Sequence, residues 1–220
     1  MSEPNKVSTY FTRNAITFDS LYSEKEMSSL MRFINRRFRR DIYERYMLSL
    51  EYVKKYNVKT VLDVGCGSGR YALGLSGIGV KQIQGIDFSP KMIELAKEYT
   101  KNVRENREVF KFICSDFMEF NTEETYDLII AMGFFDYIKD PVPVLKKMRV
   151  LSNHSVIASF PSVSIYRTPL RKIRYYFKRC PVYFFNPDMI KQFALEAEFT
   201  NCDITKIKGA GMDYFVIFSK

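Results

Sequence analysis

The sequence has few of the side chains that build metal centres. Its 220 residues include a single histidine, His154, and four cysteines, none of them in a C-x-x-C pair. Zinc sites gather cysteine and histidine at short spacings, so we expect no metal in this protein. Scattered cysteines also predict reduced thiols and a cytoplasmic location. The four cysteines are Cys66, Cys114, Cys180 and Cys202.

The sequence also lacks a long apolar run. A membrane-spanning helix needs about 20 mostly apolar residues, and no stretch approaches that length. The opening residues MSEPN are polar, which argues against a secretory signal. We therefore expect neither secretion nor a transmembrane segment, and peripheral contact with a membrane stays open. With 46% hydrophobic and 27% charged residues, the chain is expected to fold as one domain over residues 1–220.

The net charge of +9 is the unusual feature of the composition. A basic balance favours anionic partners, whether nucleic acid, anionic lipid or an acidic small molecule, without choosing among them. Two basic clusters contribute to it, at residues 36–40 and 171–178. A solvated helix surface remains the alternative explanation for both.

The most informative stretch is residues 61–70, with the sequence VLDVGCGSGR. Residues of mostly strand-forming type run into three glycines spaced two apart, and the residues from Tyr71 onward can open a helix. Glycine is needed where the backbone takes a positive φ angle, or where a ligand approaches more closely than a Cβ allows. The stretch therefore predicts a strand, a tight turn that carries a ligand, and a helix.

Small differences from other glycine loops indicate which ligand the turn carries. A dinucleotide-binding loop reads G-x-G-x-x-G, but Arg70 stands where the third glycine belongs. A phosphate-binding loop ends in lysine, and no lysine occurs between Asp63 and Lys81. Asp63 would also repel a pyrophosphate placed on the turn. A zwitterionic or cationic ligand fits better, although a glycine-rich turn of another α/β fold remains the alternative.

Strand and helix patterns alternate along the rest of the chain. Serine, aspartate or asparagine followed by proline marks three helix starts, at Ser89, Asp140 and Asn186. Alternation predicts a doubly wound α/β fold with a seven-stranded, mostly parallel sheet, and the last two strands predict a hairpin with one antiparallel strand near the edge. Ligands of such sheets bind at the carboxyl ends of the strands. After the first strand we expect strands at 81–87, 109–114, 126–131, 155–160, 202–207 and 213–218.

Two helical regions flank this core. A capping box at Ser23 and Glu26 starts one helix, and a second helix is expected to present one apolar face. That face consists of Ile42, Tyr46, Met47, Leu50 and Val53. A basic, aromatic amphipathic helix is expected after Thr168-Pro169. The expected division is N-terminal lid helices at 1–57, a ligand-binding core at 58–160, a basic insert at 161–185, and a helix and hairpin at 186–220.

Residues from about 58 to 160 resemble the class I S-adenosylmethionine-dependent methyltransferases, a Rossmann-like family in which an acidic residue precedes G-x-G-x-G. The resemblance implies S-adenosylmethionine as the cofactor. It also implies that Asp116 meets the adenine amino group and that Phe117 packs on the adenine ring. Asp87 ends the second strand, where an acid in α/β nucleoside sites can accept hydrogen bonds from ribose hydroxyls. Capping of the next helix is the alternative for Asp87, but Ser89 already suits that role. The cofactor-binding residues it implies are Asp63, Gly65, Cys66, Gly67, Gly69, Asp87, Phe88, Asp116, Phe117 and Met132.

A weaker resemblance, carried by the N-terminal helices and the basic insert, is to the small-molecule O-methyltransferases of porphyrin and quinone biosynthesis. It implies a small anionic or amphiphilic acceptor. Members of that group often place a histidine after the fourth strand, where this chain has Asp136 and Tyr137. We predict Asp136 as the general base and Tyr137 as the group that orients the acceptor, with helix capping and core packing as their alternatives. The predicted acceptor-binding residues are Tyr22, Arg36, Phe134, Arg171, Arg174 and Tyr175.

Three functions remain open from the sequence. The first is methyl transfer to a small molecule, at oxygen. The second is methylation of RNA or another nucleic acid, which the net charge favours, although the turn after the fourth strand reads MGFF instead of the N-P-P-Y type common in enzymes that methylate base amines. The third is a non-catalytic protein that binds S-adenosylmethionine. The oligomeric state and the identity of the acceptor are not predicted, because a fold does not determine them.

Overall fold

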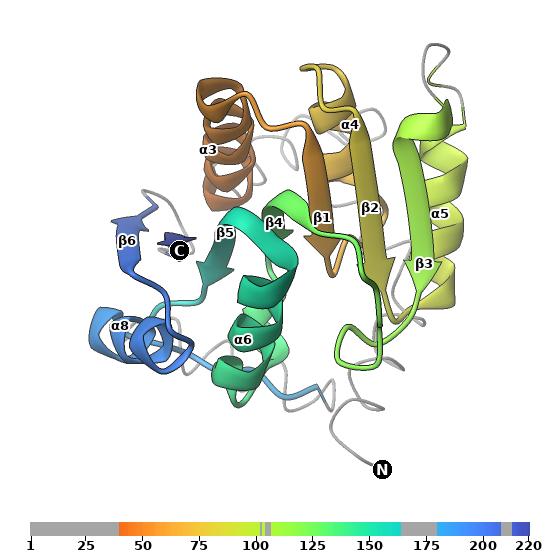
Figure 1. Ribbon diagram of the computed structural model, residues 1–220. Coiled ribbons are helices and arrows are strands. Elements are labelled where there is room, and N and C mark those ends of the chain that lie inside the picture. The colour runs from red at the N-terminus through yellow and green to blue at the C-terminus, as the bar shows by residue number, and fades with distance from the viewer. Residues whose placement is uncertain (1–39, 102, 104–106, 164–179, 208–212) are drawn as a thin grey trace.

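The computed structural model describes residues 40–101, 103, 107–163, 180–207 and 213–220 (Figure 1). The expected helix after Ser23 and the expected helix after Thr168 lie outside the described residues. So do five of the predicted acceptor-binding residues, namely Tyr22, Arg36, Arg171, Arg174 and Tyr175. Within the described part of the chain, no helix is long and apolar enough to cross a membrane.

In the described part of the chain, seven strands form one sheet in the order β3-β2-β1-β4-β5-β7-β6. All neighbouring pairs among the first five are parallel, and β7 runs antiparallel to both β5 and β6. The predicted fold class, with one antiparallel strand next to the edge, is confirmed. The strands are β1 (Thr60–Val64), β2 (Gln82–Asp87), β3 (Phe110–Cys114), β4 (Tyr126–Ala131), β5 (Ser152–Phe160), β6 (Asn201–Lys206) and β7 (Tyr214–Ser219).

Helices cover both faces of the sheet because its central strands are apolar on both sides. Leu62 and Val64 of β1 belong to the core under α6 and α8, whereas Val61 belongs to the core under α3 and α4. Figure 1 shows α6 and α8 in front of the sheet and α4 and α5 behind it. The helices are α3 (Arg40–Tyr56), α4 (Arg70–Ser76), α5 (Pro90–Thr100), α6 (Pro141–Leu151) and α8 (Pro187–Glu196), with short 3-10 turns η1 (Arg107–Val109) and η2 (Phe135–Tyr137).

The three predicted helix starts are confirmed. The side chains of Ser89, Asp140 and Asn186 are the N-caps of α5, α6 and α8, and each accepts a hydrogen bond from a backbone N–H of the first turn. A proline follows each cap, where its fixed φ suits the helix and its missing N–H has no partner to lose. Among the strands, the largest difference is at β5, which begins at Ser152 instead of Ser155.

The buried face of α3 is not the one that the apolar pattern predicted. Arg45, Ser49 and Val53 are buried along one line of the helix, whereas the other four predicted residues of that face are only half-buried. Polar contacts explain the difference. Arg45 Nη1 donates to Ser159 Oγ at 3.2 Å, and the hydroxyls of Tyr52 and Ser155 lie 2.7 Å apart. The helix therefore docks on serines of β5 through hydrogen bonds as well as through apolar packing.

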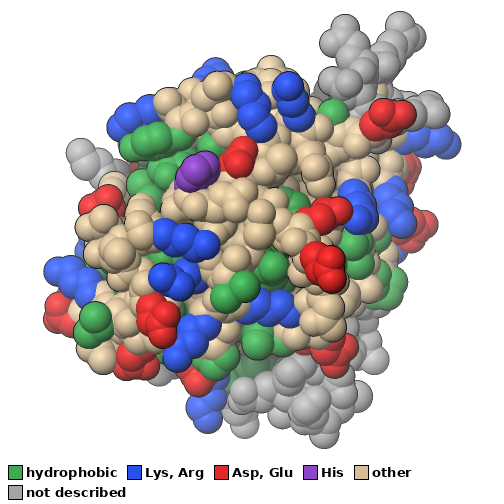
Figure 2. Space-filling view, viewed as in Figure 1, with side chains coloured by type: hydrophobic (Ala, Val, Ile, Leu, Met, Phe, Trp, Pro, Cys, Tyr) green, Lys and Arg blue, Asp and Glu red, His purple; other side chains and the backbone are tan. Residues whose placement is uncertain are grey.

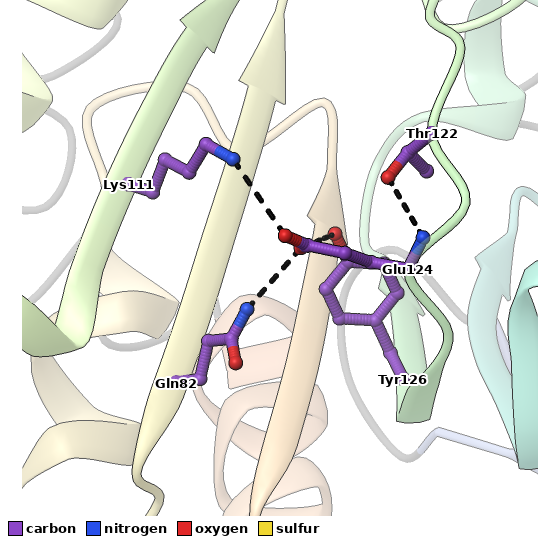
Figure 3. A network of polar contacts seen from close by, with 5 residues as sticks. All are labelled: Gln82, Lys111, Thr122, Glu124 and Tyr126. Atoms are coloured by element: carbon purple, nitrogen blue, oxygen red, sulfur yellow. Dashed lines mark hydrogen bonds and ion pairs between the residues drawn. The ribbon is translucent and has the colours of Figure 1, made fainter.

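The segment between β3 and β4 is fixed to the sheet by a polar network around Glu124 (Figure 3). The Glu124 carboxylate accepts hydrogen bonds from Gln82 at 3.3 Å and from the Tyr126 hydroxyl at 3.1 Å, and lies 4.0 Å from the ammonium of Lys111. The Glu124 N–H donates to Thr122 Oγ1 at 3.0 Å. These contacts join β2, β3 and the start of β4, and so fix where the segment returns to the sheet.

Gly85, in the middle of β2, is expected to be a stability-determining glycine. A Cβ there would lie 2.7 Å from a ring carbon of Phe112 and 2.8 Å from the sulfur of Cys66. Gly85→Ala should therefore lower the unfolding free energy by about 2 kcal/mol, the usual size of an overpacking penalty. Urea denaturation measures it, with Gly77→Ala as the control because the nearest atom to a Cβ there is 3.6 Å away. Equal stabilities of the two variants would contradict the packing argument.

Candidate cofactor site

The glycine turn lies between β1 and α4, at the carboxyl edge of the sheet. Its three glycines all have positive φ angles, of 72° at Gly65, 52° at Gly67 and 75° at Gly69. The N–H groups of Gly65 and Cys66 both donate to the carbonyl oxygen of Ile86, at 2.8 and 3.0 Å. The turn is thus fastened to the end of the neighbouring strand β2, as a preformed ligand site requires.

The three glycines are needed for different reasons. A Cβ at Gly65 would lie 2.9 Å from the ring of Phe134, and a Cβ at Gly69 would lie 3.1 Å from the Cβ of Ala96. At Gly67 no atom lies within 4 Å of such a Cβ. Packing therefore explains Gly65 and Gly69, whereas Gly67 faces open space, where a ligand can reach the backbone.

Asp87 holds this open part of the turn in place. Its Oδ2 accepts a hydrogen bond from the Gly67 N–H at 3.0 Å, and its Oδ1 accepts one from the Ser89 N–H at 2.8 Å. Burial raises the pKa of Asp87 to about 6. Each carboxylate oxygen keeps a second lone pair, so binding of ribose hydroxyls stays a prediction that this geometry allows. Removal of the side chain would also loosen the turn.

Asp63 is a second buried carboxylate beside the turn. It is 2% exposed, and its Oδ2 is buried without a hydrogen-bond partner. Burial, together with the nearby Asp87, raises the pKa of Asp63 to about 7. A buried carboxylate is expensive unless a positive charge meets it. The arrangement therefore suits a ligand with a cationic group and opposes a phosphate.

Cys66 contributes to the turn through its backbone. Its side chain is 7% exposed, and burial raises the pKa of the thiol well above its usual value. The thiol therefore stays protonated and is a poor nucleophile. No disulfide joins any two of the four cysteines, and within the described ranges no group of His, Cys, Asp and Glu could hold a metal ion.

The segment after β3 carries the predicted adenine contacts. Asp116 Oδ1 accepts a hydrogen bond from the Met118 N–H at 2.8 Å, so the carboxylate also closes a local turn. Phe117 is 4% exposed and packs in the core under α6, whereas the neighbouring Met118 is 47% exposed. Contact of Phe117 with an adenine ring stays a prediction. In the structure its ring packs in the core and anchors the segment to it. Phe88, at the end of β2, is half-buried.

The residues after β4 lie at the same edge of the sheet. Met132 is 8% exposed, and the half-buried Phe134 packs on the glycine turn at Gly65. Asp136 is 5% exposed and lies in η2 next to the half-buried Tyr137, and its carbonyl oxygen accepts a hydrogen bond from the Tyr183 N–H at 2.9 Å. The structure thus places both predicted catalytic residues after β4, at the same edge of the sheet as the glycine turn. Their roles stay predictions.

A contact between Arg45 and Ser159 was not predicted from the sequence. Arg45 is 8% exposed, and its Nη2 would lie 3.4 Å from a Cβ built on Gly133. Ser159 Oγ accepts hydrogen bonds from both Arg45 and the Gly133 N–H, the latter at 2.7 Å. An arginine in a helix pattern predicts a solvated position, so only the unusual pair of serines in an apolar strand could have indicated this contact.

The charge distribution on the viewed face is mixed. Figure 2 shows Lys and Arg side chains dispersed among Asp and Glu over this face. Such a surface is typical of solvated charge and does not resemble a basic stripe for a nucleic-acid backbone. His154, near the start of β5, is exposed.

The open glycine turn, its two buried carboxylates and the acid after β3 define a nucleoside-binding α/β protein of the Rossmann-like class. The family model described as "Methyltransferase domain" matches residues 56–174, more than half of the chain. The chain therefore belongs to the methyltransferase-domain family, the class I S-adenosylmethionine-dependent methyltransferases, as the glycine motif indicates.

Relatives whose names state different acceptors match part of the chain. Malonyl-[acyl-carrier protein] O-methyltransferase of Bacillus anthracis is 35% identical over 89 residues, which are 40% of this chain and 31% of that protein. The tRNA U34 carboxymethyltransferase of Shewanella piezotolerans is 33% identical over 91 residues, 41% of this chain and 27% of that protein. The chain thus spans about a third of the length of these curated relatives.

A solved structure extends the likeness to the whole fold. Magnesium protoporphyrin IX methyltransferase from Synechocystis, with bound S-adenosylhomocysteine, superposes with a TM-score of 0.80 at 17% identity and covers 99% of both chains. At this identity the likeness shows the fold, and the acceptor has to be argued from the site.

Proposed function

We propose that this domain transfers the methyl group of S-adenosylmethionine to an oxygen of a small anionic acceptor. The observation that carries the proposal is the turn that is open at Gly67 and flanked by the buried carboxylates of Asp63 and Asp87. In it, Asp63 meets the ammonium group, Asp87 the ribose hydroxyls, and Asp116 the adenine amino group. The amino-acid part then lies over β1 and the adenosine over β2 and β3.

This placement puts the acceptor over β4 and β5. In the sheet order, β4 is the neighbour of β1 on the side away from β2, so the methyl group of a donor bound in this way faces the end of β4. The donor supplies a methyl carbon already activated by a sulfonium. The chain has to hold the acceptor oxygen in line with that carbon and exclude water. Phe134, packed on Gly65, covers one side of this position.

Proton handling depends on the acceptor. A hydroxyl loses a proton as its oxygen bonds to the methyl carbon, and Asp136 is the nearest predicted base in the sequence after β4. A carboxylate is already ionised and needs no base. Methylation of a carboxylate oxygen would therefore need no counterpart of the histidine that related enzymes often place after the fourth strand.

The position of Arg45 is evidence for an anionic acceptor. Its buried guanidinium lies beside Gly133 and Ser159, at the carboxyl ends of β4 and β5, where the acceptor is placed. A fixed positive charge in a partly desolvated position attracts an anion far more strongly than a solvated one does. Two of the matched proteins have names that state O-methylation of a small molecule or an acyl group.

Arg45→Met is expected to raise the KM for an anionic acceptor by about tenfold and to leave S-adenosylmethionine affinity unchanged. Steady-state kinetics at several salt concentrations measures the effect. In the wild type, added salt should weaken the attraction between Arg45 and the acceptor and so raise KM. Arg45→Lys keeps the charge and should retain part of the affinity. Ser159→Ala removes the same hydrogen bond without removing the charge, and an equal rise of KM in that variant would contradict a charge effect.

The acceptor class is tested with methyl-labelled S-adenosylmethionine. The panel contains aromatic carboxylic acids, acyl thioesters with a free carboxylate, phenols, and total tRNA. Label in a carboxylate or phenol fraction supports the proposal. RNA is the second candidate, because of the net charge of +9 and the tRNA-modifying relatives. Label in tRNA alone would replace the small-molecule proposal with it.

A further inference from the structure

Lys147 of α6 reaches across to the segment that follows β3. Its Nζ donates hydrogen bonds to the carbonyl oxygen of Met118 at 2.9 Å and to that of Phe120. The same ammonium lies over the ring of Phe117, 5.2 Å from its centroid. One side chain of α6 thus contacts three residues of the segment, namely Phe117, Met118 and Phe120.

The segment held in this way is a single irregular turn. The carbonyl oxygen of Asp116 accepts hydrogen bonds from the N–H groups of Glu119 and Phe120, at 3.2 and 3.0 Å. The Asp116 carboxylate closes the turn at its start through the Met118 N–H. Carbonyl groups at the end of a turn have no partner within it, and the Lys147 ammonium supplies one. Without that ammonium, the turn would keep the hydrogen bonds of Asp116, the one from Asn121 Nδ2 to the Glu119 carbonyl oxygen, and the buried rings of Phe117 and Phe120, but it would lose its polar link to α6.

Apolar packing alone would not need a lysine here. Ordering a lysine removes more side-chain entropy than ordering most other residues, and partial burial lowers the pKa of Lys147, against the opposing effect of the Asp116 charge. A methionine could fill the same space without the desolvation of a charge. What the ammonium adds is a defined distance between α6 and the backbone that carries Asp116.

We propose that Lys147 is a positioning residue that sets the adenine specificity of the cofactor site by holding the turn at residues 116–120. The inference rests on the proposed function, in which Asp116 accepts a hydrogen bond from the adenine amino group. That bond requires the carboxylate at one position relative to Asp87, which binds the ribose. Displacement of the turn weakens adenine recognition and leaves the methionine end of the site unaltered.

The test compares Lys147→Met with Lys146→Met, an exposed neighbour on the same helix. S-adenosylhomocysteine and its inosine analogue, which lacks the amino group, are titrated into both variants and the wild type. For Lys147→Met the Kd for S-adenosylhomocysteine should rise about tenfold, while the Kd for the inosine analogue changes less than about twofold. Lys147→Arg, which can donate to two carbonyls, should restore part of the preference. With the acceptor in hand, KM for the donor should rise without a change in kcat.

Three outcomes decide the matter. Loss of the adenine preference in Lys147→Met, and not in Lys146→Met, supports the inference. An unchanged preference in a folded Lys147→Met, or an equal loss of affinity for both ligands, overturns it, since a purely structural role weakens both alike. A wild type that binds neither ligand overturns the proposed function itself and the inference with it.

Discussion

Asp63→Asn is expected to stabilise the ligand-free protein and to abolish most of its affinity for S-adenosylmethionine. The carboxylate is 2% exposed and has a buried oxygen without a hydrogen-bond partner, so it is unfavourable in the folded, ligand-free chain. In the proposed complex it meets the ammonium of the ligand. Loss of a charge-assisted hydrogen bond should weaken binding by about 10- to 100-fold. Opposite changes in stability and affinity are the signature of a functional carboxylate.

The pH dependence follows from the same group. Burial and Asp87 raise the pKa of Asp63 to about 7 from a usual value of 3.8. Between these values the folded chain holds a proton that the unfolded chain has lost. The contribution of Asp63 to stability is therefore present below about pH 4 and is lost as the pH rises to about 7. Asp63→Asn removes this slope, and at about pH 8 it should be more stable than the wild type.

Ligand affinity should change with pH in the opposite direction. Only the ionised Asp63 meets the ammonium, so wild-type affinity should fall by up to about tenfold for each pH unit below about 7, with a further contribution from Asp87 below about 6. Thermal unfolding and calorimetry measure the two effects. Asp127→Asn is the control, because Asp127 accepts hydrogen bonds from the N–H groups of Lys59 and Thr60 at the other end of the strands. It should lose stability and keep its affinity. The same pattern in Asp63→Asn would contradict the assigned role.

The second large effect is expected at Gly67. A Cβ there meets no protein atom within 4 Å, so Gly67→Ala should fold. The added methyl group would stand where the proposed ligand approaches the backbone, and S-adenosylmethionine affinity should fall by about 5- to 100-fold. Titration of S-adenosylmethionine into the folded variant measures the loss.

Gly79→Ala is a closely matched control. Gly79 also has a positive φ angle, of 91°, and a Cβ added there would likewise meet no atom within 4 Å. Both variants therefore carry the strain of a side chain at positive φ, about 1–2 kcal/mol. Only Gly67→Ala should lose affinity. If Gly67→Ala binds as tightly as Gly79→Ala, the ligand does not lie on the turn.

Much of the fold could be predicted because local signals agreed with the global pattern. The caps at Ser89, Asp140 and Asn186 define helix starts through contacts within one turn, which a sequence displays directly. The glycine turn could also be predicted, because backbone positions with positive φ angles favour glycine. The antiparallel place of β7 followed from the hairpin pattern of the last two strands.

Contacts between distant parts of the chain could not be predicted. The hydrogen bond between Arg45 and Ser159 joins residues 114 positions apart, and neither residue type indicates the other. The need for glycine at position 85 was not predicted, because it arises from close contacts with Phe112 of the neighbouring strand and Cys66 of the turn. Contact of Phe117 with the adenine ring was predicted from its place after the third strand. The position of its ring in the core, under Lys147 of α6, follows only from the packing of distant elements.

Calorimetric titration of the purified 220-residue chain tests whether the turn between β1 and α4 binds S-adenosylmethionine. S-adenosylmethionine, S-adenosylhomocysteine and NAD are titrated separately at about pH 7.5, where Asp63 is largely ionised. We expect one molecule of S-adenosylmethionine or S-adenosylhomocysteine to bind per chain, and NAD not to bind. Binding of NAD, with neither of the other two compounds bound, would contradict a cofactor site on this turn.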